Sequence, residues 1–331
     1  MNSLWSSKRV LVTGAGGFIA SHLVEALVQA GASVKAFVRY NSRGDPGLLA
    51  MLPPEVLKEV EIIAGDLRDA AAIQQAAKGA NLIFHLGALI AIPYSYLHPV
   101  EVVETNVMGT LNVLMAARLL GVERVVHTST SEVYGTARHV PIDENHQLQG
   151  QSPYSASKIG ADKLAESFFC SYELPVVTLR PFNTFGPRQS ARAVIPTIIS
   201  QALALKIVHL GNLETKRDFT YVSDTVAGFL RAGEVLGIEG QTFNLGVGKE
   251  VSVKELADII LGLLNQPAEI VVDQDRLRPQ KSEVLRLLSD NSRARSILGW
   301  EPVISLKEGL ARTIEWVKAH PDLYHPEEYQ R

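Results

Sequence analysis

The stretch VLVTGAGGFIASHLVEAL, residues 10–27, is the strongest indicator of the fold. A short apolar strand pattern leads into a glycine-rich turn, and a helical pattern follows. Gly14 and Gly17 would allow a tight turn and a close approach of the backbone to a pyrophosphate at the helix N-terminus. Ala20 would let helix and strand pack closely. Because a strand precedes the turn and a helix follows it, the pattern favours a dinucleotide site over a purely structural turn.

Short apolar runs and longer amphipathic runs alternate through the first half of the chain. We expect strands at residues 9–13, 34–38, 61–64, 82–86, 125–128 and 176–180. We expect helices at residues 18–30, 70–77 and 100–120, and another after Pro153. Such alternation predicts an α/β fold of the Rossmann type, with a doubly wound parallel sheet covered by helices on both faces.

The pattern changes near Asn183, where loops rich in Gly, Pro and Arg appear. We expect further helices at residues 195–205, 222–236, 253–264 and 306–319, and a polar loop from Asp273 to Glu283. These elements predict a smaller C-terminal α/β lobe that packs on the sheet, with a cleft between them. The expected division is an NAD(P)-binding domain at 1–182 and a substrate lobe at 183–331, with chain crossings between them.

Composition excludes several classes of protein. The 331 residues are 46% hydrophobic and 20% charged, which is typical of a packed globular protein and not of a disordered one. A net charge of -3 does not indicate a nucleic-acid surface. One cysteine, Cys170, excludes an internal disulfide and a multi-cysteine metal site, and we expect no metal. No apolar run suggests a membrane span or a signal peptide, so a cytoplasmic protein is expected.

The end of the second expected strand bears on the choice of cofactor. It reads FVRYNSRG, with Arg39 and Arg43 and no acid before Asp45. A guanidinium suits a 2′-phosphate, which favours NADP over NAD. The alternatives for Arg39 are a solvated loop position or stacking on adenine. Asp66 is placed to reach the adenine edge, or else to cap the following helix.

Two segments carry the expected chemistry: HTSTSEVYG at 127–135 and SPYSASKIGADKLAE at 152–166. Tyr154 and Lys158 lie four residues apart, so on a helix they share one face. An ammonium beside the phenol favours the phenolate and would lower the pKa of Tyr154. Tyr154 could then act as a general base, with Thr130 hydrogen-bonded to the reacting hydroxyl.

The sequence resembles the extended short-chain dehydrogenase/reductase family. The motifs that carry the resemblance occur in order: TGAGGFIA, GDLRD, HLGA, TNVMGT, STSEVYG, YSASK, RPFNTFGP, RDFTYVSD, FNLG and LGWEP. Several ordered motifs are far more specific than one. The resemblance implies a Rossmann domain, bound NAD(P), a nucleotide-sugar substrate and a homodimer formed by two helices per subunit. It places the cofactor at Gly14, Gly17, Phe18, Ile19, Arg39, Asp66, Leu67, Leu86, Ala88, Asn106, Thr128, Tyr154 and Lys158.

Within this family, Glu132 is the informative residue. Nucleotide-sugar 4,6-dehydratases carry an acid directly after the catalytic threonine, whereas 4-epimerases usually have a small residue there. Oxidation at C4 makes the C5 proton acidic, and a carboxylate must remove it. The pair Ser131-Glu132 resembles the GDP-mannose 4,6-dehydratase pattern. It departs from the Asp-Glu pair of many hexose dehydratases, so Ser131 would polarise the C6 hydroxyl without being a strong proton donor. The alternative for Glu132 is an ordinary surface carboxylate.

The substrate contacts also rest on the resemblance. It assigns Asn183 to the substrate phosphates and Val194 to the same site. Arg217 and Arg278, and less strongly Arg192, are candidates for a pyrophosphate clamp. The alternative for each arginine is a solvated or salt-bridged surface position. The runs 129–168 and 180–199 most resemble N-acetylglucosamine-nucleotide 4,6-dehydratases of legionaminic acid biosynthesis, which implies UDP- or GDP-N-acetylglucosamine as substrate. In the loop LGALIAIPYSY, residues 89–92 suggest an apolar wall for an acetamido methyl, with core packing as an equal explanation.

Three functions therefore remain open from the sequence. The leading one is the nucleotide-hexosamine 4,6-dehydratase. A nucleotide-sugar 4-epimerase would need Tyr154 and Lys158 but not Glu132, and a GDP-mannose 4,6-dehydratase is a second enzymatic alternative. A redox-sensing protein that binds NAD(P) without turnover is disfavoured because both Tyr154 and Lys158 are present.

Overall fold

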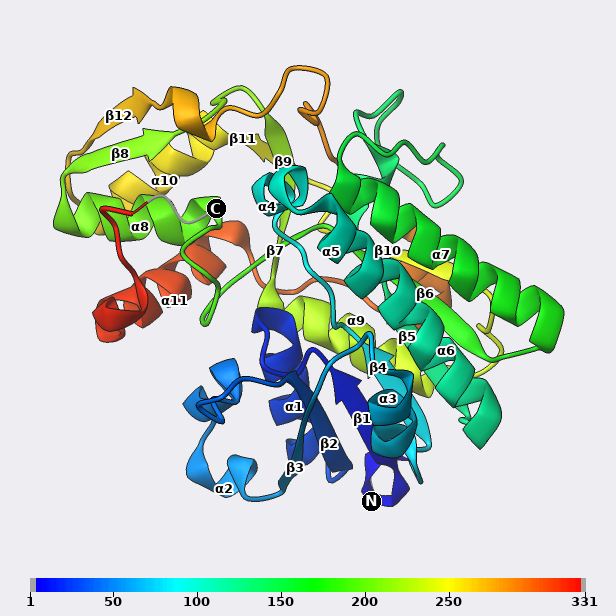
Figure 1. Ribbon diagram of the computed structural model, residues 1–331. Coiled ribbons are helices and arrows are strands. Elements are labelled where there is room, and N and C mark those ends of the chain that lie inside the picture. Colours follow the sequence, from blue (N-terminus) through cyan, green and yellow to red (C-terminus); the bar gives the residue numbers. More distant parts are fainter. Residues whose placement is uncertain (1–3, 329–331) are drawn as a thin grey trace.

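The computed structural model describes residues 4–328 and is built around one parallel sheet (Figure 1). Within that range its seven strands lie in the order β10-β6-β5-β4-β1-β2-β3, and every neighbouring pair is parallel. The strands are β1 (Arg9–Thr13), β2 (Ser33–Arg39), β3 (Val60–Gly65), β4 (Leu82–His85), β5 (Arg124–Thr128), β6 (Val176–Pro181) and β10 (Thr242–Leu245). The expected doubly wound parallel sheet is confirmed.

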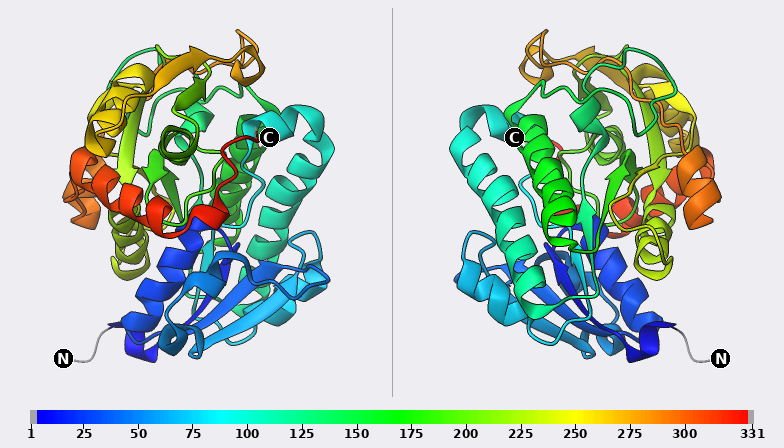
Figure 2. Two further views of the ribbon diagram at one scale, coloured as in Figure 1. Left: turned by 90° about the vertical axis from the view of Figure 1, so that its left-hand side faces the viewer. Right: turned by 90° about the vertical axis from the view of Figure 1, so that its right-hand side faces the viewer.

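Helices cover both faces of this sheet, as Figure 2 shows. On one face α1 packs against α9; on the other α3 packs against α6, and α6 against α7. These helices are α1 (Phe18–Gln29), α3 (Ala70–Ala77), α6 (Gly109–Leu120), α7 (Pro153–Tyr172) and α9 (Val222–Glu234). Because both faces are covered, strands such as β4 and β6 are buried along their whole length, which explains their continuous apolar runs.

The expected helix at 100–120 is a continuous helical run with a local irregularity. It comprises α5 (Pro99–Val103), a π-helical segment (Glu104–Met108) and α6. A π segment widens the turn by one residue and is frequent at functional sites. The short helices α2 (Pro54–Leu57) and α4 (Ile92–Leu97) precede this run.

The second part of the chain forms a smaller α/β lobe above the carboxyl ends of the strands (Figure 1). Its strands form two small sheets, in the orders β11-β9-β7 and β12-β8. Its elements are β7 (Asn183–Phe185), α8 (Val194–Ala204), β8 (Ile207–Leu210), β9 (Lys216–Tyr221), β11 (Glu250–Ser252), α10 (Val253–Leu264), β12 (Glu269–Val272) and α11 (Leu306–Ala319). Two elements from beyond Asn183, α9 and β10, return to the main sheet.

The segment 273–283 is a loop apart from one turn of 3-10 helix at Gln274–Arg276. Over residues 4–328, no helix combines the length and the apolar character that a membrane span requires.

Candidate active site

The glycine-rich turn after β1 comes very close to the loop after β4. Gly14 has a φ of +67°, and a Cβ placed there would lie 2.5 Å from the Cα of Gly87. Only glycine combines that backbone conformation with that approach. The turn leads to Gly17, the N-cap of α1, and no side chain of the described residues caps the helix there. The first N–H groups of α1, from Phe18 and Ile19 onward, are therefore available to an anion such as a pyrophosphate.

Beside this turn lies a small pocket of about 120 Å³. Its lining combines residues from four strand ends, and includes Gly14, Arg39, Asp66, Leu67, Gly87 and Ala88. A parallel sheet binds nucleotides at the carboxyl ends of its strands, and this pocket sits there. The pocket and the uncapped helix terminus together fit the adenosine and pyrophosphate parts of a dinucleotide.

The polar residues of this pocket make their own ion pairs. Arg39, whose side chain is 67% exposed, lies 3.2 Å from Glu101 on α5. Asp66 binds Arg68 at 2.7 Å, and that bond holds the pKa of Asp66 below its usual value. The cap of α3 is Asp69, whose carboxylate accepts hydrogen bonds from the N–H groups of Ala71 and Ala72. The capping alternative for Asp66 is therefore wrong, because the true cap lies three residues later.

The structure also places three other residues that the resemblance assigns to the cofactor. The side chain of Asn106, on the π segment, binds the backbone N–H and carbonyl of Leu89 at 2.7 and 2.9 Å and the hydroxyl of Ser157 at 3.0 Å. It therefore holds the loop after β4 against α7. Leu86 continues β4 through a backbone bond to Thr13. The Oγ1 of Thr128 is buried and meets no hydrogen-bond partner within residues 4–328, so it remains available to a ligand.

Tyr154 lies in the first turn of α7, which has a well-defined start. Ser152 and Ser155 form a capping box, with bonds of 3.0 and 3.1 Å between each hydroxyl and the other's N–H. Pro153 occupies the first helical position, where the missing N–H costs nothing. The capping box fixes where α7 begins. Tyr154 and Lys158 share the buried face of this helix, as their spacing predicted.

The pKa of Tyr154 does not behave as the Tyr-Lys spacing suggested. Burial raises the pKa of Tyr154, the hydrogen bond with Thr130 opposes that shift, and the negative charges of Glu132 and Asp162 add to it. The Nζ of Lys158 instead donates to the backbone carbonyl of Thr128 at 2.6 Å. The expected lowering of the pKa of Tyr154 is thus wrong for the chain on its own, because burial raises this pKa and the ammonium of Lys158 bonds Thr128 instead.

Lys158 lies above a buried ionic cluster centred on Asp162, one turn further along α7. The carboxylate of Asp162 accepts hydrogen bonds from Ser129 at 2.7 Å and Arg180 at 3.0 Å, and lies 3.1 Å from His127. Burial opposes the ionisation of Asp162, but these neighbours hold its pKa at about 2. Burial lowers the pKa of Lys158 to about 8, and the charge of Asp162 raises it. Asp162 therefore helps to keep Lys158 protonated.

This coupling predicts a pH effect. In Asp162→Asn the raising charge is lost, so Lys158 should lose its proton at a lower pH than about 8. The alkaline fall in kcat/KM should consequently move to lower pH, as measured between pH 6 and 9.5. Circular dichroism checks the fold at each pH, and Asp258→Asn, which changes an exposed acid on α10, serves as control. An unmoved alkaline limb in a folded variant would contradict the coupling.

Thr130, Ser131 and Glu132 lie on a tight turn directly after β5. Thr130 is the N-cap of a 3-10 helix at Ser131–Tyr134, and its Oγ1 accepts a hydrogen bond from the N–H of Glu132 at 3.2 Å. The same Thr130 hydroxyl bonds Tyr154. One short turn thus brings Thr130 and Glu132 to Tyr154. Ser131 is buried, at 3% exposure.

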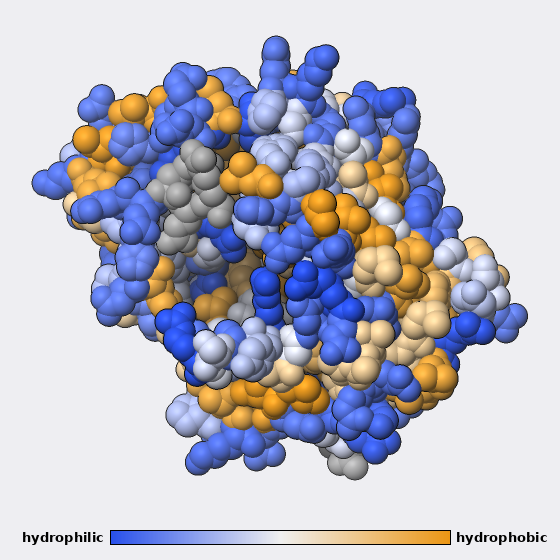
Figure 3. All heavy atoms as spheres, viewed as in Figure 1, coloured by the Kyte–Doolittle hydropathy of each residue, from blue (hydrophilic) through white to orange (hydrophobic). Residues whose placement is uncertain are grey.

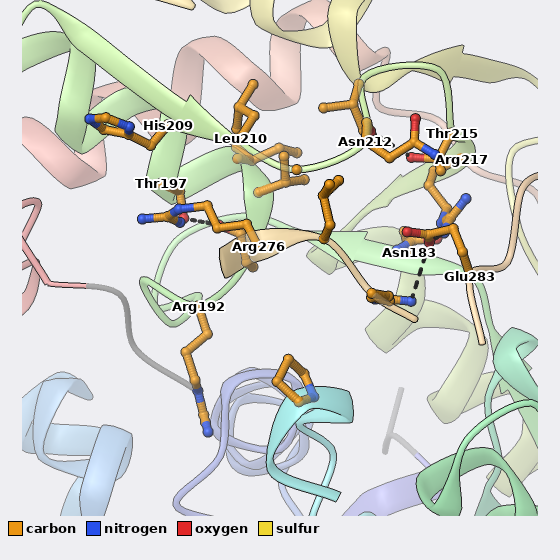
Figure 4. A pocket seen from close by; sticks show the side chains of 18 of the residues that line it. Asn183, Arg192, Thr197, His209, Leu210, Asn212, Thr215, Arg217, Arg276 and Glu283 are labelled. Carbon is orange, nitrogen blue, oxygen red and sulfur yellow. Dashed lines mark hydrogen bonds and ion pairs between the residues drawn. The ribbon is translucent and has the colours of Figure 1, made fainter. Parts of the chain in front are cut away.

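The smaller lobe contributes a larger cavity of about 480 Å³. Figure 3 shows the surface hollowed between the lobe and the sheet domain. The residues assigned to substrate all line the cavity: Asn183, Arg192, Val194, Arg217 and Arg278. In Figure 4, Asn183 and Arg217 lie together at one end with Glu283, whereas Arg192 lies apart and points away from them. The Oδ1 of Asn183 is buried without a hydrogen-bond partner in the described residues.

Two arginines and two carboxylates meet at that end of the cavity. Arg278 Nη1 lies 4.0 Å from Glu132 and 3.8 Å from Glu283, and Arg217 Nη2 lies 3.8 Å from Glu283. Glu132, expected at the reacting centre, and Arg278, expected at the phosphates, are therefore neighbours. Nothing in the sequence pattern singled out Glu283 within its polar loop. Asp162 could have been found, because it follows Lys158 by four residues on the same helical face.

The loop at residues 89–92 does not form the expected apolar wall. Leu89 lines the small pocket beside Gly14, Ile90 is 61% exposed, and Ile92 is buried in the core. From this region the large cavity is lined by Pro93, Tyr96 and Leu97. Core packing and the other pocket explain the apolar residues.

Comparison with known proteins groups the chain with nucleotide-sugar enzymes. Residues 11–313 match the family described as GDP-mannose 4,6 dehydratase. A UDP-glucose 4-epimerase of Mycolicibacterium smegmatis is 36% identical over 94% of this chain and 98% of its own. A UDP-N-acetylglucosamine 4-epimerase from Methanobrevibacter ruminantium, solved with UDP-N-acetylmuramic acid, is 30% identical, with a TM-score of 0.86 over 95% of this chain and 99% of its own. The dTDP-glucose 4,6-dehydratase DesIV of Streptomyces venezuelae, solved with NAD bound, is 31% identical, with a TM-score of 0.84 over 97% of this chain and 100% of its own.

Proposed function

Because the chain belongs to the GDP-mannose 4,6 dehydratase family of nucleotide-sugar dehydratases and epimerases, we propose that it is a 4,6-dehydratase of nucleotide-linked hexosamines. The observation that carries the proposal is the turn after β5, which brings Glu132 beside Thr130 and Tyr154. A 4-epimerase has no task for a carboxylate there. A dehydratase needs one to remove the C5 proton.

The residues divide the proposed reaction among them. Tyr154 takes the proton of the C4 hydroxyl, and Thr130 orients that hydroxyl. Glu132 removes the C5 proton and then gives it to the hydroxyl that leaves from C6 as water, while Ser131 polarises that hydroxyl. The proton that Tyr154 took from the C4 hydroxyl balances the one that C5 regains. Bound nicotinamide would supply the hydride acceptor for C4 and the hydride donor for C6, and the positive charge of its oxidised form would favour the phenolate of Tyr154. The sum is loss of one water with no net change in cofactor.

The residues that would hold the dinucleotide fit it well. The uncapped N-terminus of α1 suits its pyrophosphate, and the pocket around Gly14 and Leu67 suits its adenosine. The Oγ1 of Thr128, which has no partner in the described residues, can hydrogen-bond the dinucleotide. Arg39 and Arg68 both line the adenosine pocket, and its carboxylate, Asp66, is already bound by Arg68. Two guanidinium groups beside a single carboxylate favour a 2′-phosphate in this pocket. We propose NADP as the preferred form, although a related dehydratase was solved with NAD.

The cofactor preference can be measured without turnover. Arg39→Ser should weaken NADP binding about tenfold and change NAD binding by less than about twofold, because one charged contact to the 2′-phosphate is lost. Isothermal titration of each cofactor gives both values. Arg43→Ser, an exposed arginine on the same loop that does not line the pocket, is the matched control. Equal losses for NAD and NADP would count against a 2′-phosphate contact.

We propose UDP- or GDP-N-acetylglucosamine as the substrate and legionaminic acid biosynthesis as the setting. The support is the similarity of residues 129–168 and 180–199 to enzymes of that kind, and the likeness to a UDP-N-acetylglucosamine 4-epimerase. The cavity of about 480 Å³ is large enough for a nucleotide sugar.

Mass spectrometry of the reaction tests the function directly. The protein is incubated separately with UDP-N-acetylglucosamine, GDP-N-acetylglucosamine and GDP-mannose. Loss of one water from one of them, with no net consumption of cofactor, is the expected result, and it names the nucleotide and the sugar. An unchanged mass together with a new isomer would overturn the proposal in favour of a 4-epimerase. That second function is favoured by the 36% identity to a UDP-glucose 4-epimerase.

The surface of the helical run 99–120 supports the proposed homodimer. Its exposed apolar side chains are Val100, Val103, Met108, Met115 and Leu119. We expect a mass of twice the 36.1 kDa chain by light scattering. Leu119→Asp should give a monomer, because a buried unpaired charge at an interface is costly. Leu236→Asp changes another exposed leucine, away from this face, and should leave the dimer intact. A monomeric wild-type protein would contradict the proposal.

A further inference from the structure

Glu283 is a carboxylate in a place where anion binding is expected. It lines the large cavity, and its side chain is 12% exposed. Its oxygen lies 3.8 Å from Arg217 and 3.8 Å from Arg278, the two arginines of the proposed pyrophosphate clamp. The nucleotide diphosphate would add negative charge beside it. A site built only to bind phosphate would have no use for this carboxylate, so its presence needs an explanation.

The contacts of Glu283 with the two arginines are ion pairs without hydrogen bonds. Distances of 3.8 and 4.0 Å are longer than hydrogen bonds. The Nη1 of Arg278 is buried, and it has no hydrogen-bond acceptor in the part of the chain that the structure describes. Burial lowers the pKa of Arg217, while the charges of Glu132 and Glu283 raise it. The two carboxylates therefore balance the charge of the arginines and leave a donor of Arg278 unused.

The loop that carries Glu283 is fixed to the catalytic domain. Ser282 donates a hydrogen bond to the carbonyl of Gln151 at 2.5 Å, directly before α7, and bonds the hydroxyl of Tyr96 at 2.6 Å. The hydroxyl of Thr136 donates to the carbonyl of Glu283 at 3.3 Å. Glu283 is thus held in place beside the arginines and is not a mobile surface acid.

We propose that Glu283 is a positioning residue that stands in for the substrate pyrophosphate, a role that rests on the proposed function. Before substrate binds, it holds Arg217 and Arg278 and keeps Arg278 from pairing closely with Glu132. When the pyrophosphate arrives, it takes the unused donor of Arg278 and displaces Glu283 as the partner of Arg217, and Glu132 is left as a free base. The repulsion between Glu283 and the phosphates weakens nucleotide binding and so favours release of the product.

This role predicts that Glu283→Gln binds UDP more tightly and yet turns over more slowly, a combination that a purely structural role does not predict. In Glu283→Gln the repulsion is lost, so UDP should bind about tenfold more tightly. The gain should be smaller for UMP, which lacks the second phosphate. Arg278, no longer shared, should move toward Glu132, so kcat should fall while KM also falls. A residue that bonds the substrate, or that only supports the loop, would weaken UDP binding when changed.

Isothermal titration of the full chain with UDP, GDP and UMP tests the proposal. Glu250→Gln is the matched control, because Glu250 has the same 12% side-chain exposure and pairs with an arginine, Arg286, without lining the cavity. Glu283→Asp keeps the charge and should bind UDP within about twofold of wild type. If Glu283→Gln does not fold, Glu283→Ala replaces it.

The outcomes separate this proposal from the function on which it rests. Wild-type protein that binds neither UDP nor GDP would remove the proposed function and this role with it. Wild-type binding of a nucleotide diphosphate, with unchanged or weaker binding by Glu283→Gln, would overturn only the role of Glu283. The expected result is that Glu283→Gln gains more affinity for UDP than for UMP relative to wild type, with a lower kcat.

Discussion

Tyr154→Phe should lower kcat by about a thousandfold or more, within the range expected for loss of a general acid-base group. Phenylalanine fills the same buried space in the first turn of α7, so the capping box of Ser152 and Ser155 is retained. What is lost is the phenolic oxygen that bonds Thr130 and takes the proton of the C4 hydroxyl. Turnover of UDP-N-acetylglucosamine, followed by mass spectrometry, measures the effect.

Two checks make this result specific. Tyr172→Phe changes an exposed tyrosine at the far end of the same helix and should leave kcat unchanged. Titration with NADP should show that Tyr154→Phe still binds the dinucleotide within a few-fold, since the α1 terminus and the adenosine pocket are untouched. A variant that keeps even a tenth of wild-type turnover would exclude Tyr154 as the proton acceptor.

Glu132→Gln has the second largest expected effect, a loss of dehydration of at least about a hundredfold. The amide keeps the shape of the side chain, and the bond from the Glu132 N–H to Thr130 belongs to the backbone, so the turn remains. Tyr154 and Thr130 can still act at C4. The variant should therefore oxidise C4 in a single turnover but fail to release water, and the C5 proton should not exchange with deuterium from solvent.

The result distinguishes the two enzyme classes. A 4-epimerase should lose little activity in Glu132→Gln, because rotation and reduction of a keto sugar require no base at C5. Glu166→Gln, which changes an exposed acid paired with Lys163 on α7, is the control for the loss of a charge. Dehydration at the wild-type rate in Glu132→Gln would return Glu132 to the status of an ordinary carboxylate.

Local patterns were sufficient for most of the sheet. The first strand and the helices α3, α10 and α11 match their expected bounds, and the other predicted strands differ by one residue at one or both ends. Strand β10 was missed, because its place beside β6 depends on pairing with residues such as Thr178, which lies 64 positions before Thr242. Short edge strands carry too little local signal to be recognised alone.

The site was predicted only in part, because local patterns reveal some of its residues and long-range contacts bring in the others. Ordered motifs marked Tyr154, Lys158 and Glu132, because their spacing is local. Which charges meet across the fold was not visible: Glu283 lies between Arg217 and Arg278, and Asp162 lies beneath Lys158. The direction of the pKa shift of Tyr154 was also missed. Desolvation depends on everything packed around the phenol, and the neighbouring residues in the chain do not report it.

Spacing along the chain was therefore enough for the architecture, the glycine-rich turn after β1 and the shared face of Tyr154 and Lys158, because hydrophobic period, glycine placement and helical repeat act over a few residues. The folded structure alone decided how much each group is buried and which distant charges become neighbours. Those quantities depend on the packing of segments far apart in the sequence. They set the electrostatics of the site, from the protonated Lys158 to the shared Arg278 between Glu132 and Glu283.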